Sequence, residues 1–243
     1  LLLDGATGTE LERRGLQTKL PLWTALAARD VPELLLSVHQ DYVHAGADIL
    51  TACTFRTSRF TLSKSGLSDL AWPITQKAVH IARQATVGTS KKLLVAGSIG
   101  PLEDCYAPAK APHDAILERE HETHANHLAR AGVDLMLVES MPTAREALIA
   151  TQAALRTGLP VITSLLARRH GLLFDHSPLR SVIAQLALLP IQLVSVNCCS
   201  LQACDEAIPY LSACGLPWGL YPNASDPDGS FGGTIKDLDR DLF

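Results

Sequence analysis

The sequence predicts an α/β fold, a (β/α)8 barrel of the TIM type whose eighth strand is absent from the chain as given. Strand-like and helix-like segments alternate along the chain, and no stretch between them resembles a linker. The strands are apolar throughout, which is typical of a parallel sheet covered by helices. Seven strands in one undivided domain, residues 1–243, favour a barrel over a doubly wound sheet. The first turn, residues 5–10, also lacks the G-x-G-x-x-G spacing of a dinucleotide-binding fold.

Each strand is expected at a short apolar run bounded by turn residues. The first run, residues 1–4, ends in Asp4 and is followed by the small-residue turn 5–9. The later runs are rich in Val, Ile and Leu, which suit buried strands. They span residues 48–53, 93–99, 133–138, 159–166, 191–197 and 217–221.

Each helix is expected where apolar residues recur at helical spacing. In residues 32–45, Leu35, Val38 and Tyr42 have this spacing, and Gly46 follows as a C-terminal stop. Two later helices also end at a glycine. The expected helices span residues 10–14, 32–45, 70–86, 115–131, 143–157, 179–188 and 201–214.

Composition narrows the class of protein. A hydrophobic content of 47%, a charged content of 19% and a net charge of -4 describe an ordinary globular chain with no electrostatic reason to bind nucleic acid. No apolar run is long enough to span a bilayer, so no membrane partner is expected. The chain opens without Met and without the features of a signal peptide, which predicts a cytoplasmic location. Reduced thiols are therefore expected at Cys53, Cys105, Cys198, Cys199, Cys204 and Cys214.

The tail of the chain provides no strand that could close the barrel. Residues 223–243 are polar and rich in Gly, Asp and Pro. We therefore expect the domain to be incomplete at its C-terminus. The open edge of the seventh strand would be a template for pairing, so a missing segment or a second copy in a homo-oligomer is expected to cover it.

Polar residues gather at the C-terminal ends of the expected strands, where barrels of this class place their chemistry. These strand ends surround the opening of the barrel, which is called the mouth below. Two carboxylates at the mouth suit a substrate ammonium group, and a thiolate suits zinc. The strand-end residues are Asp4, Cys53, Thr54, Ser98, Glu139, Ser164, Asn197, Cys198, Tyr221 and Asn223.

Seven short motifs in order along the chain resemble the homocysteine S-methyltransferase family. They include Leu3-Asp4-Gly5-Ala6-Thr7-Gly8-Thr9 near the start, Val138-Glu139-Ser140 in the middle, and Val196-Asn197-Cys198 towards the end. The remaining motifs are residues 45–55, 97–101, 174–179 and 221–224. The resemblance extends from Leu1 to about Asn223.

The resemblance implies a barrel enzyme that moves a methyl group from a sulfonium donor, such as S-methylmethionine or S-adenosylmethionine, onto homocysteine, giving methionine. In the family, three cysteine thiolates bind Zn²⁺ and the substrate thiol takes the fourth position. Cys198 matches the first ligand, and Asp4 and Glu139 match acids associated with the homocysteine amino group. Of the remaining matches, Asn197 adjoins the ligand, and Thr54 and Phe55 match a pocket-lining segment.

The main departure from the family concerns the metal. The two other ligands lie in a Gly-Gly-Cys-Cys segment with no match in this chain, so they are expected beyond Phe243. If no such segment exists, the alternative is a non-catalytic or metal-free barrel relative that binds a small amino acid or a protein partner. Cys53 and Cys199 could also serve as ligands, but packing in the core or the pocket wall is the favoured interpretation for both.

Two other groups of side chains are not expected to form sites. His121, His124 and His127 drift around one helix, and the zinc-binding motif needs a spacing of four residues, so we expect a solvated helix face. The remaining thiols are expected to pack in the core or to be incidental: Cys204, Cys214 and Cys105.

Overall fold

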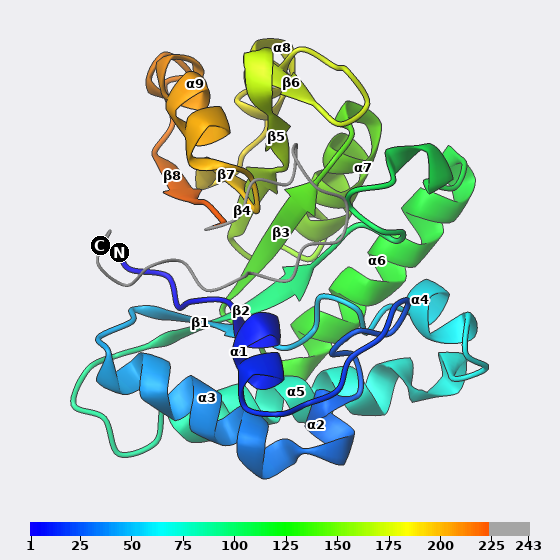
Figure 1. Cartoon of the computed structure of the whole chain (residues 1–243), viewed down its shortest axis with the longest axis vertical. Coiled ribbons are helices and arrows are strands. Elements are labelled where there is room, and N and C mark those ends of the chain that lie inside the picture. The colour runs from blue at the N-terminus through cyan, green and yellow to red at the C-terminus, as the bar shows by residue number, and fades with distance from the viewer. Residues whose placement is uncertain (224–243) are drawn as a thin grey trace.

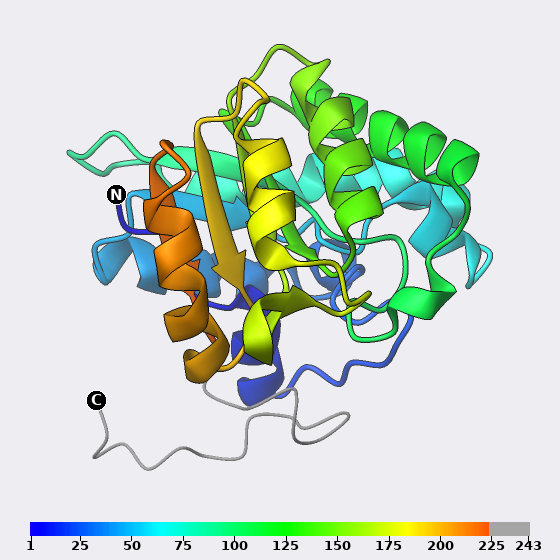
Figure 2. The same ribbon diagram turned by 90° about the horizontal axis from the view of Figure 1, so that it is seen from above.

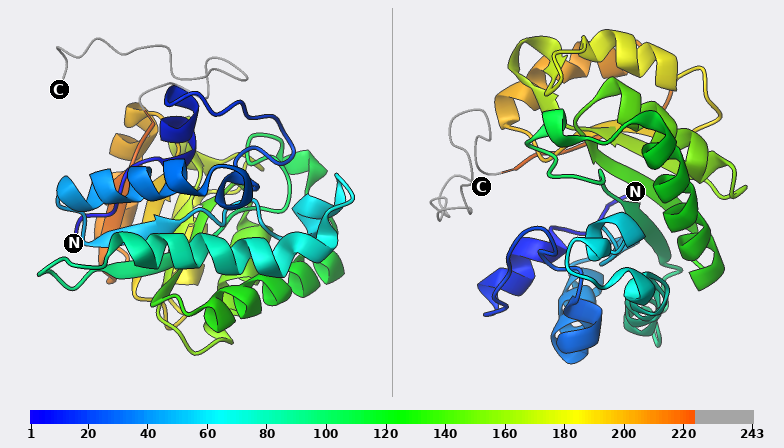
Figure 3. Two further views of the ribbon diagram at one scale, coloured as in Figure 1. Left: turned by 90° about the horizontal axis from the view of Figure 1, so that it is seen from below. Right: turned by 90° about the vertical axis from the view of Figure 1, so that its right-hand side faces the viewer.

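One parallel sheet organises the computed structural model, which describes residues 1–223 (Figure 1). Its six strands lie in the order β1-β2-β3-β4-β7-β8, and every neighbouring pair is parallel. The sheet is curled, with an open side (Figure 3). The strands are β1 (Ile49–Ala52), β2 (Leu94–Ile99), β3 (Leu135–Met141), β4 (Val161–Leu165), β7 (Leu193–Asn197) and β8 (Trp218–Tyr221).

Helices cover the convex side of the sheet, and the chain crosses over through them between successive parallel strands (Figures 2 and 3). The α-helices are α1 (Thr7–Arg13), α2 (Ala27–Asp30), α3 (Pro32–His44), α4 (Arg59–Ser63), α5 (Ala71–Ala85), α6 (Asp114–Ala131), α7 (Ala144–Leu155), α8 (Leu179–Leu186) and α9 (Leu201–Ser212). The 3-10 helices are η1 (Ser68–Leu70), η2 (Pro108–Lys110) and η3 (Arg169–Gly171). Among residues 1–223 we find no helix with the length and apolar character that crossing a membrane requires.

The core lies between the strands and these helices. Met136 and Val138 of β3 and Val194 and Val196 of β7 are fully buried, which explains why the strand sequences are apolar throughout. Burial of each such side chain contributes about 1.5–3 kcal/mol.

The predicted fold class is confirmed, with one difference at the first strand. In place of a strand over residues 1–4, a single parallel bridge joins Leu3 to Ile49, and Asp4 N donates to Ile49 O at 3.0 Å. Leu1 and Leu2 are exposed, so this end gains little from burial. Within residues 1–223, β8 pairs with β7 alone, so the described part of the sheet is an open half-barrel.

A short hairpin that the sequence did not predict follows β4. Strands β5 (Ala167–Arg168) and β6 (Leu172–Leu173) pair antiparallel. The turn between them passes through His170, whose φ is 67°. Two-residue strands carry too little periodicity to be recognised, and a histidine in a left-handed conformation is uncommon.

The solvated histidine face predicted for helix α6 is wrong. His121 is 0% exposed and His124 is 3% exposed, because α6 packs against both α5 and α7. His127 is half-buried and lies with its ring centroid 5.6 Å from that of Trp72.

Candidate active site

Asp4 lies buried where the N-terminal segment meets β1. Thr51 of β1 donates to both carboxylate oxygens, from its backbone N to Oδ2 and from its Oγ1 to Oδ1, each at 2.7 Å. Burial nevertheless raises the pKa of Asp4 to about 7, and the nearby Glu139 charge adds to the rise. Asp4 and Glu139 therefore interact across one mouth.

Glu139 lies inside β3, two residues before the strand ends, at an irregularity in the pairing between Val138 and Met141. Ser98 Oγ at the end of β2 donates to Glu139 Oε1, and the Tyr221 hydroxyl of β8 donates to Oε2 at 3.1 Å. Burial raises the pKa of Glu139. Three strands thus hold one carboxylate at the concave side of the sheet.

Cys198 follows β7 directly and has a left-handed backbone, with φ 54°. Its sulfur accepts hydrogen bonds from Ser140 Oγ at 3.3 Å and Asn197 Nδ2 at 3.2 Å. Ser140, next to Glu139, is also left-handed, with φ 58°. Non-glycine residues in this conformation carry strain and cluster at functional sites.

Asn197 is fully buried and its side chain is used entirely within the protein. Its Oδ1 accepts from Ser140 N at 2.9 Å and Ser164 Oγ at 2.7 Å, and its Nδ2 donates to Ser140 Oγ at 2.8 Å as well as to the Cys198 sulfur. The amide therefore connects the ends of β3, β4 and β7. The structure therefore shows Asn197 supporting Cys198 and Ser140.

The backbone of Cys198 is held as firmly as its sulfur. Its carbonyl oxygen accepts from the Tyr106 hydroxyl at 3.2 Å and from Asn223 Nδ2 at 3.1 Å, and its N–H donates to Tyr221 O. Burial raises the pKa of the Cys198 thiol to about 12, against the opposing effect of the Ser140 and Asn197 donors. A cation at the sulfur would favour the thiolate form of Cys198.

Thr54 and Phe55 follow β1 and differ in what they contact. Thr54 Oγ1 donates to Ser98 O at 2.9 Å and accepts from Ser98 N at 3.0 Å, so the buried hydroxyl joins β1 to β2. Phe55 is half-buried and packs edge-on against Trp23, with ring centroids 6.1 Å apart. Phe55 therefore offers an apolar surface, whereas Thr54 supports the strand ends.

Four other thiols lie in the core, and Cys214 is half-buried. Cys53 is buried beside Thr24, 3.7 Å from its carbonyl oxygen, and the Cys199 sulfur lies 3.4 Å from that of Cys204 on α9. Cys105 is also buried, close enough to Cys198 for its charge to raise the Cys105 pKa further. Within the described residues, no three Cys, His, Asp or Glu side chains come together in a group that could hold a metal ion.

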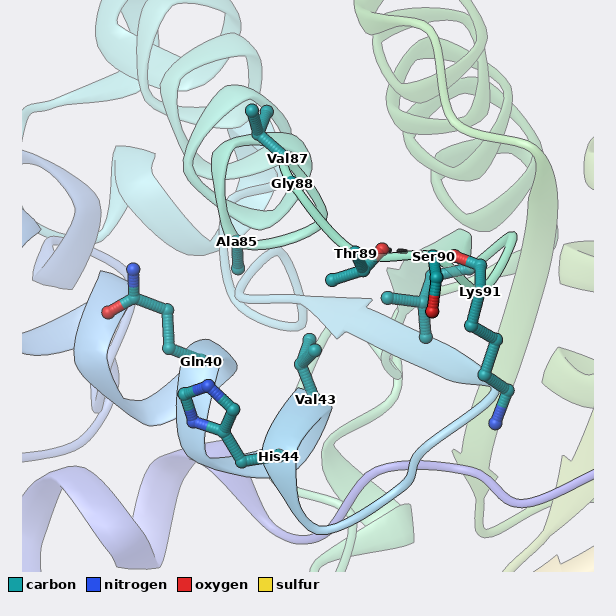
Figure 4. Close-up of a pocket in the computed structure, with 10 residues that line it drawn as sticks. Gln40, Val43, His44, Ala85, Val87, Gly88, Thr89, Ser90 and Lys91 are labelled. Carbon is teal, nitrogen blue, oxygen red and sulfur yellow. Dashed lines mark hydrogen bonds between the residues drawn. The ribbon is translucent and has the colours of Figure 1, made fainter.

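A pocket of about 470 Å³ lies at the opposite end of the strands, between the C-terminal ends of α3 and α5 (Figure 4). Lys91 at its edge lies 2.5 Å from Asp48 and also donates to Gly46 O at 3.0 Å. Asp4, Glu139 and Cys198 are not among the residues that line it. The candidate site therefore lies at the C-terminal ends of the strands, on the concave side of the sheet.

Three contributors to the site were missed in the sequence: Thr51, Tyr106 and Ser140. Ser140 adjoins Glu139, but nothing in the sequence shows the irregularity in β3 that turns its hydroxyl towards Cys198. Tyr106 lies in the loop after β2, 92 positions from the carbonyl that it contacts. Contacts of this range follow from the curled geometry of the sheet and have no local signal.

The curled parallel sheet, with carboxylates and a thiol at the C-terminal ends of its strands, defines an α/β-barrel protein with an enzyme-like mouth. A family model described as homocysteine S-methyltransferase matches residues 1–242. The chain therefore belongs to the homocysteine S-methyltransferase family.

Individual relatives agree with this assignment. The homocysteine S-methyltransferase of Escherichia coli is 32% identical over an alignment 244 residues long, gaps included, which covers 93% of this chain and 78% of that protein. A selenocysteine methyltransferase of Astragalus bisulcatus is 29% identical over 60% of this chain, which spans 52% of that relative. The crystal structure of the homocysteine methyltransferase MmuM from Escherichia coli in its metallated form superimposes with a TM-score of 0.77 at 25% identity, covering 94% of this chain and 93% of that one.

Proposed function

We propose that this chain is a zinc-dependent homocysteine S-methyltransferase that takes the methyl group of a sulfonium compound, such as S-methylmethionine or S-adenosylmethionine, and forms methionine in the cytoplasm. The observation that carries the proposal is the convergence of Asp4, Glu139 and Cys198 on one mouth, with two carboxylates beside one thiol. An amino acid whose side chain ends in a thiol matches this combination.

The carboxylates are suited to bind the substrate ammonium group. Their hydrogen bonds come from the neutral donors Thr51, Ser98 and Tyr221, and both carboxyls have raised pKa values because they are buried. A buried carboxylate is costly without a cation, and a substrate ammonium would supply one. Binding would thereby favour the ionised carboxylates and orient the amino acid with its thiol towards Cys198.

Cys198 is suited to be one thiolate ligand of zinc. Its sulfur has two donors that would stabilise a thiolate, Ser140 and Asn197, in the manner of outer-shell groups at metal sites. The described residues provide this one ligand, and two further cysteine ligands are proposed beyond Phe243. When bound, zinc would supply the Lewis acidity that keeps a substrate thiol ionised near neutral pH.

The rest of the reaction requires little from acid–base groups. A sulfonium donor leaves as a neutral thioether once its methyl group has moved to the homocysteine sulfur, so no proton need be delivered to the leaving group. The contribution of the protein is to hold the two sulfur atoms in line, with Asp4 and Glu139 fixing the acceptor and Phe55 lining the apolar side.

The test uses the full-length protein with its natural C-terminus. We expect zinc to co-purify in stoichiometric amounts and methionine to form from homocysteine with at least one sulfonium donor. Cys198→Ala should remove zinc and activity together, whereas Cys214→Ala, at the half-buried thiol that follows α9, should change neither. Full-length protein that binds no zinc and forms no methionine would overturn the proposal.

A non-catalytic or metal-free relative is the second candidate, because residues 1–223 contain one thiol of the proposed ligand set and no complete group of ligands. Such a protein would bind a small amino acid or a protein partner. It would retain homocysteine through Asp4 and Glu139 in a calorimetric titration and show neither zinc nor turnover. A homo-oligomer that covers the open edge of β8 is compatible with both candidates.

A further inference from the structure

We propose that His121 and His124 of α6, together with Glu146 of α7, position the segment 98–102 and thereby set the orientation of Glu139. This segment runs from the end of β2 into the loop that follows it and is called the turn below. We call these three side chains the outer clamp, since they lie on the helical side of the sheet, behind the mouth. The inference rests on the proposed function for the ligand concerned, the amino group of homocysteine.

His124 contacts the start of the turn. Its Nε2 lies 3.3 Å from the carbonyl oxygen of Ser98, so this nitrogen carries the proton and donates it. Thr54 Oγ1 donates to the same oxygen at 2.9 Å. Burial lowers the pKa of His124 to about 4, so the ring is a neutral donor in the working range of pH. The carbonyl is thus held by two donors from two elements.

Glu146 contacts the end of the turn. Its Oε1 accepts from the backbone N of Leu102 at 2.8 Å, and His121 Nε2 lies 3.0 Å from the same oxygen. Glu146 occupies the third position of α7, whose first residue follows the capping residue Thr143. A glutamate at this position commonly turns back to its own helix start, whereas Glu146 reaches across to the loop after β2.

The turn between these two contacts carries groups of the site. Ser98 Oγ donates to Glu139, and the ring of Phe55 lies against Gly100, so close that a Cβ there would be 2.6 Å from a ring atom. A shift of the turn would move the donor of Glu139 and the support of Phe55 together. The outer clamp is therefore connected to Glu139, the proposed partner of the substrate ammonium group, through the single backbone segment 98–102.

His121 and Glu146 each have a side chain only 1% exposed. Burying polar groups costs free energy that an apolar pair of similar volume would not incur. Glu146 Oε2, His121 Nδ1 and His124 Nδ1 are buried without a hydrogen-bond partner in the described part of the chain. Positioning of the turn explains why polar groups occupy this interface.

The test compares four variants of the full-length, zinc-loaded protein. His124→Phe keeps the ring and removes the donor, and Glu146→Leu removes the acceptor at similar volume. Glu146→Gln keeps an oxygen for both Leu102 N and His121. His127→Phe is the matched control, since His127 lies on the same helix and its ring packs against Trp72.

We expect His124→Phe and Glu146→Leu to raise the KM for homocysteine about tenfold, the loss expected when a hydrogen bond to a charged group is disturbed. The KM for the methyl donor and the zinc content should stay unchanged, and Glu146→Gln and His127→Phe should resemble the unaltered protein. A partly unfolded preparation lowers the apparent kcat without changing KM. A raised KM therefore indicates a loss of positioning, whereas a lowered kcat alone indicates partial unfolding.

The clamp can also be tested without catalysis. Hydrogen exchange of the segment 98–102, followed by mass spectrometry, should quicken in His124→Phe and Glu146→Leu and remain unchanged in His127→Phe. If the unaltered protein forms no methionine, the proposed function fails while this measurement still tests the clamp. Unchanged exchange and unchanged KM in folded His124→Phe and Glu146→Leu would overturn the inference, as would failure of Glu146→Gln to preserve the KM.

Discussion

Ser140 and Cys198 contact one another through their side chains, and both have left-handed backbones, although they lie at the ends of two strands, β3 and β7, that are not neighbours in the sheet. The Ser140 hydroxyl donates to the Cys198 sulfur at 3.3 Å, with φ angles of 58° and 54° at the two residues. Asn197 donates to both side chains and so fixes the pair. The geometry around the candidate ligand thus depends on two strained residues held by one amide.

This relationship allows stability and metal binding to be separated at Ser140. Ser140→Ala and Ser140→Gly both remove the donor to Cys198 and should weaken zinc binding by about 10–100-fold. Glycine tolerates a positive φ and alanine does not, so Ser140→Gly should be more stable than Ser140→Ala by about 1 kcal/mol.

Zinc competition with a chromogenic chelator and urea unfolding would measure the two effects. Ser181→Ala, on α8, is a control for the loss of a serine hydroxyl away from Cys198. Equal stability of the two Ser140 variants would show that the left-handed backbone costs nothing, and unchanged zinc affinity would remove the role of the hydroxyl.

Asp4 should make homocysteine binding depend on pH. Its pKa is raised from 3.8 to about 7 by burial, so the carboxyl is mostly protonated below pH 7 and cannot pair with an ammonium group there. The dissociation constant for homocysteine should therefore rise as the pH falls through about 7. Calorimetric titration between pH 5.5 and 8.5 measures this, and Asp4→Asn should bind weakly with a flatter profile. A wild-type affinity that is constant over this range would contradict the assignment.

The same shift has a defined effect on stability. A folded-state pKa above the unfolded value means that the folded protein binds the extra proton between pH 3.8 and about 7, so stability from Asp4 falls as the pH rises through this window. The loss approaches about 4 kcal/mol above pH 7 in the absence of substrate. Asp4→Asn should lack this loss. Asp48→Asn, at a half-buried carboxylate whose pKa is lowered by Lys91, should retain it.

The Tyr221 hydroxyl should act on homocysteine binding through Glu139, because no hydrogen bond joins that hydroxyl to the Cys198 sulfur in the described part of the chain. Tyr221→Phe removes the 3.1 Å hydrogen bond to Glu139 and leaves the ring in place. We expect a KM for homocysteine that is higher by about tenfold, because a hydrogen bond to a carboxylate contributes about 1.5 kcal/mol. Zinc content should not change. Tyr210→Phe, on α9, is the control, and a KM shift of equal size there would show that the effect is not specific to Glu139.

The strand-end residues of the site could be predicted because the parallel sheet itself gathers them. Asp4, Glu139 and Cys198 each follow or lie near the end of an apolar run, so the fold class alone places them at one mouth. The orientation of Ser140 could not be predicted, since it depends on an irregularity within β3. The spacing of His121 and His124 was visible too, but periodicity identifies a helix face and does not say whether neighbouring helices cover it.

Gly100 should tolerate no side chain, because it lies at the contact between the turn after β2 and the Phe55 ring. A Cβ at this position would lie 2.6–2.9 Å from three ring atoms, so Phe55 would have to move. We expect Gly100→Ala to destabilise the protein by about 1–3 kcal/mol, the usual cost of overpacking, and to raise the KM for homocysteine. Urea unfolding and steady-state kinetics measure the two effects.

Gly219 of β8 provides the matched control for Gly100→Ala. Its added Cβ would have no neighbour closer than 3.8 Å, which is ordinary van der Waals contact. Gly219→Ala should therefore be neutral or stabilising by about 0.4–1 kcal/mol, since alanine restricts the unfolded chain. If the two variants lost equal stability, glycine content in general would be responsible, and Phe55 would have no specific need for the space at Gly100. If Gly100→Ala lost stability and kept a normal KM, the ring would line the core and not the substrate site.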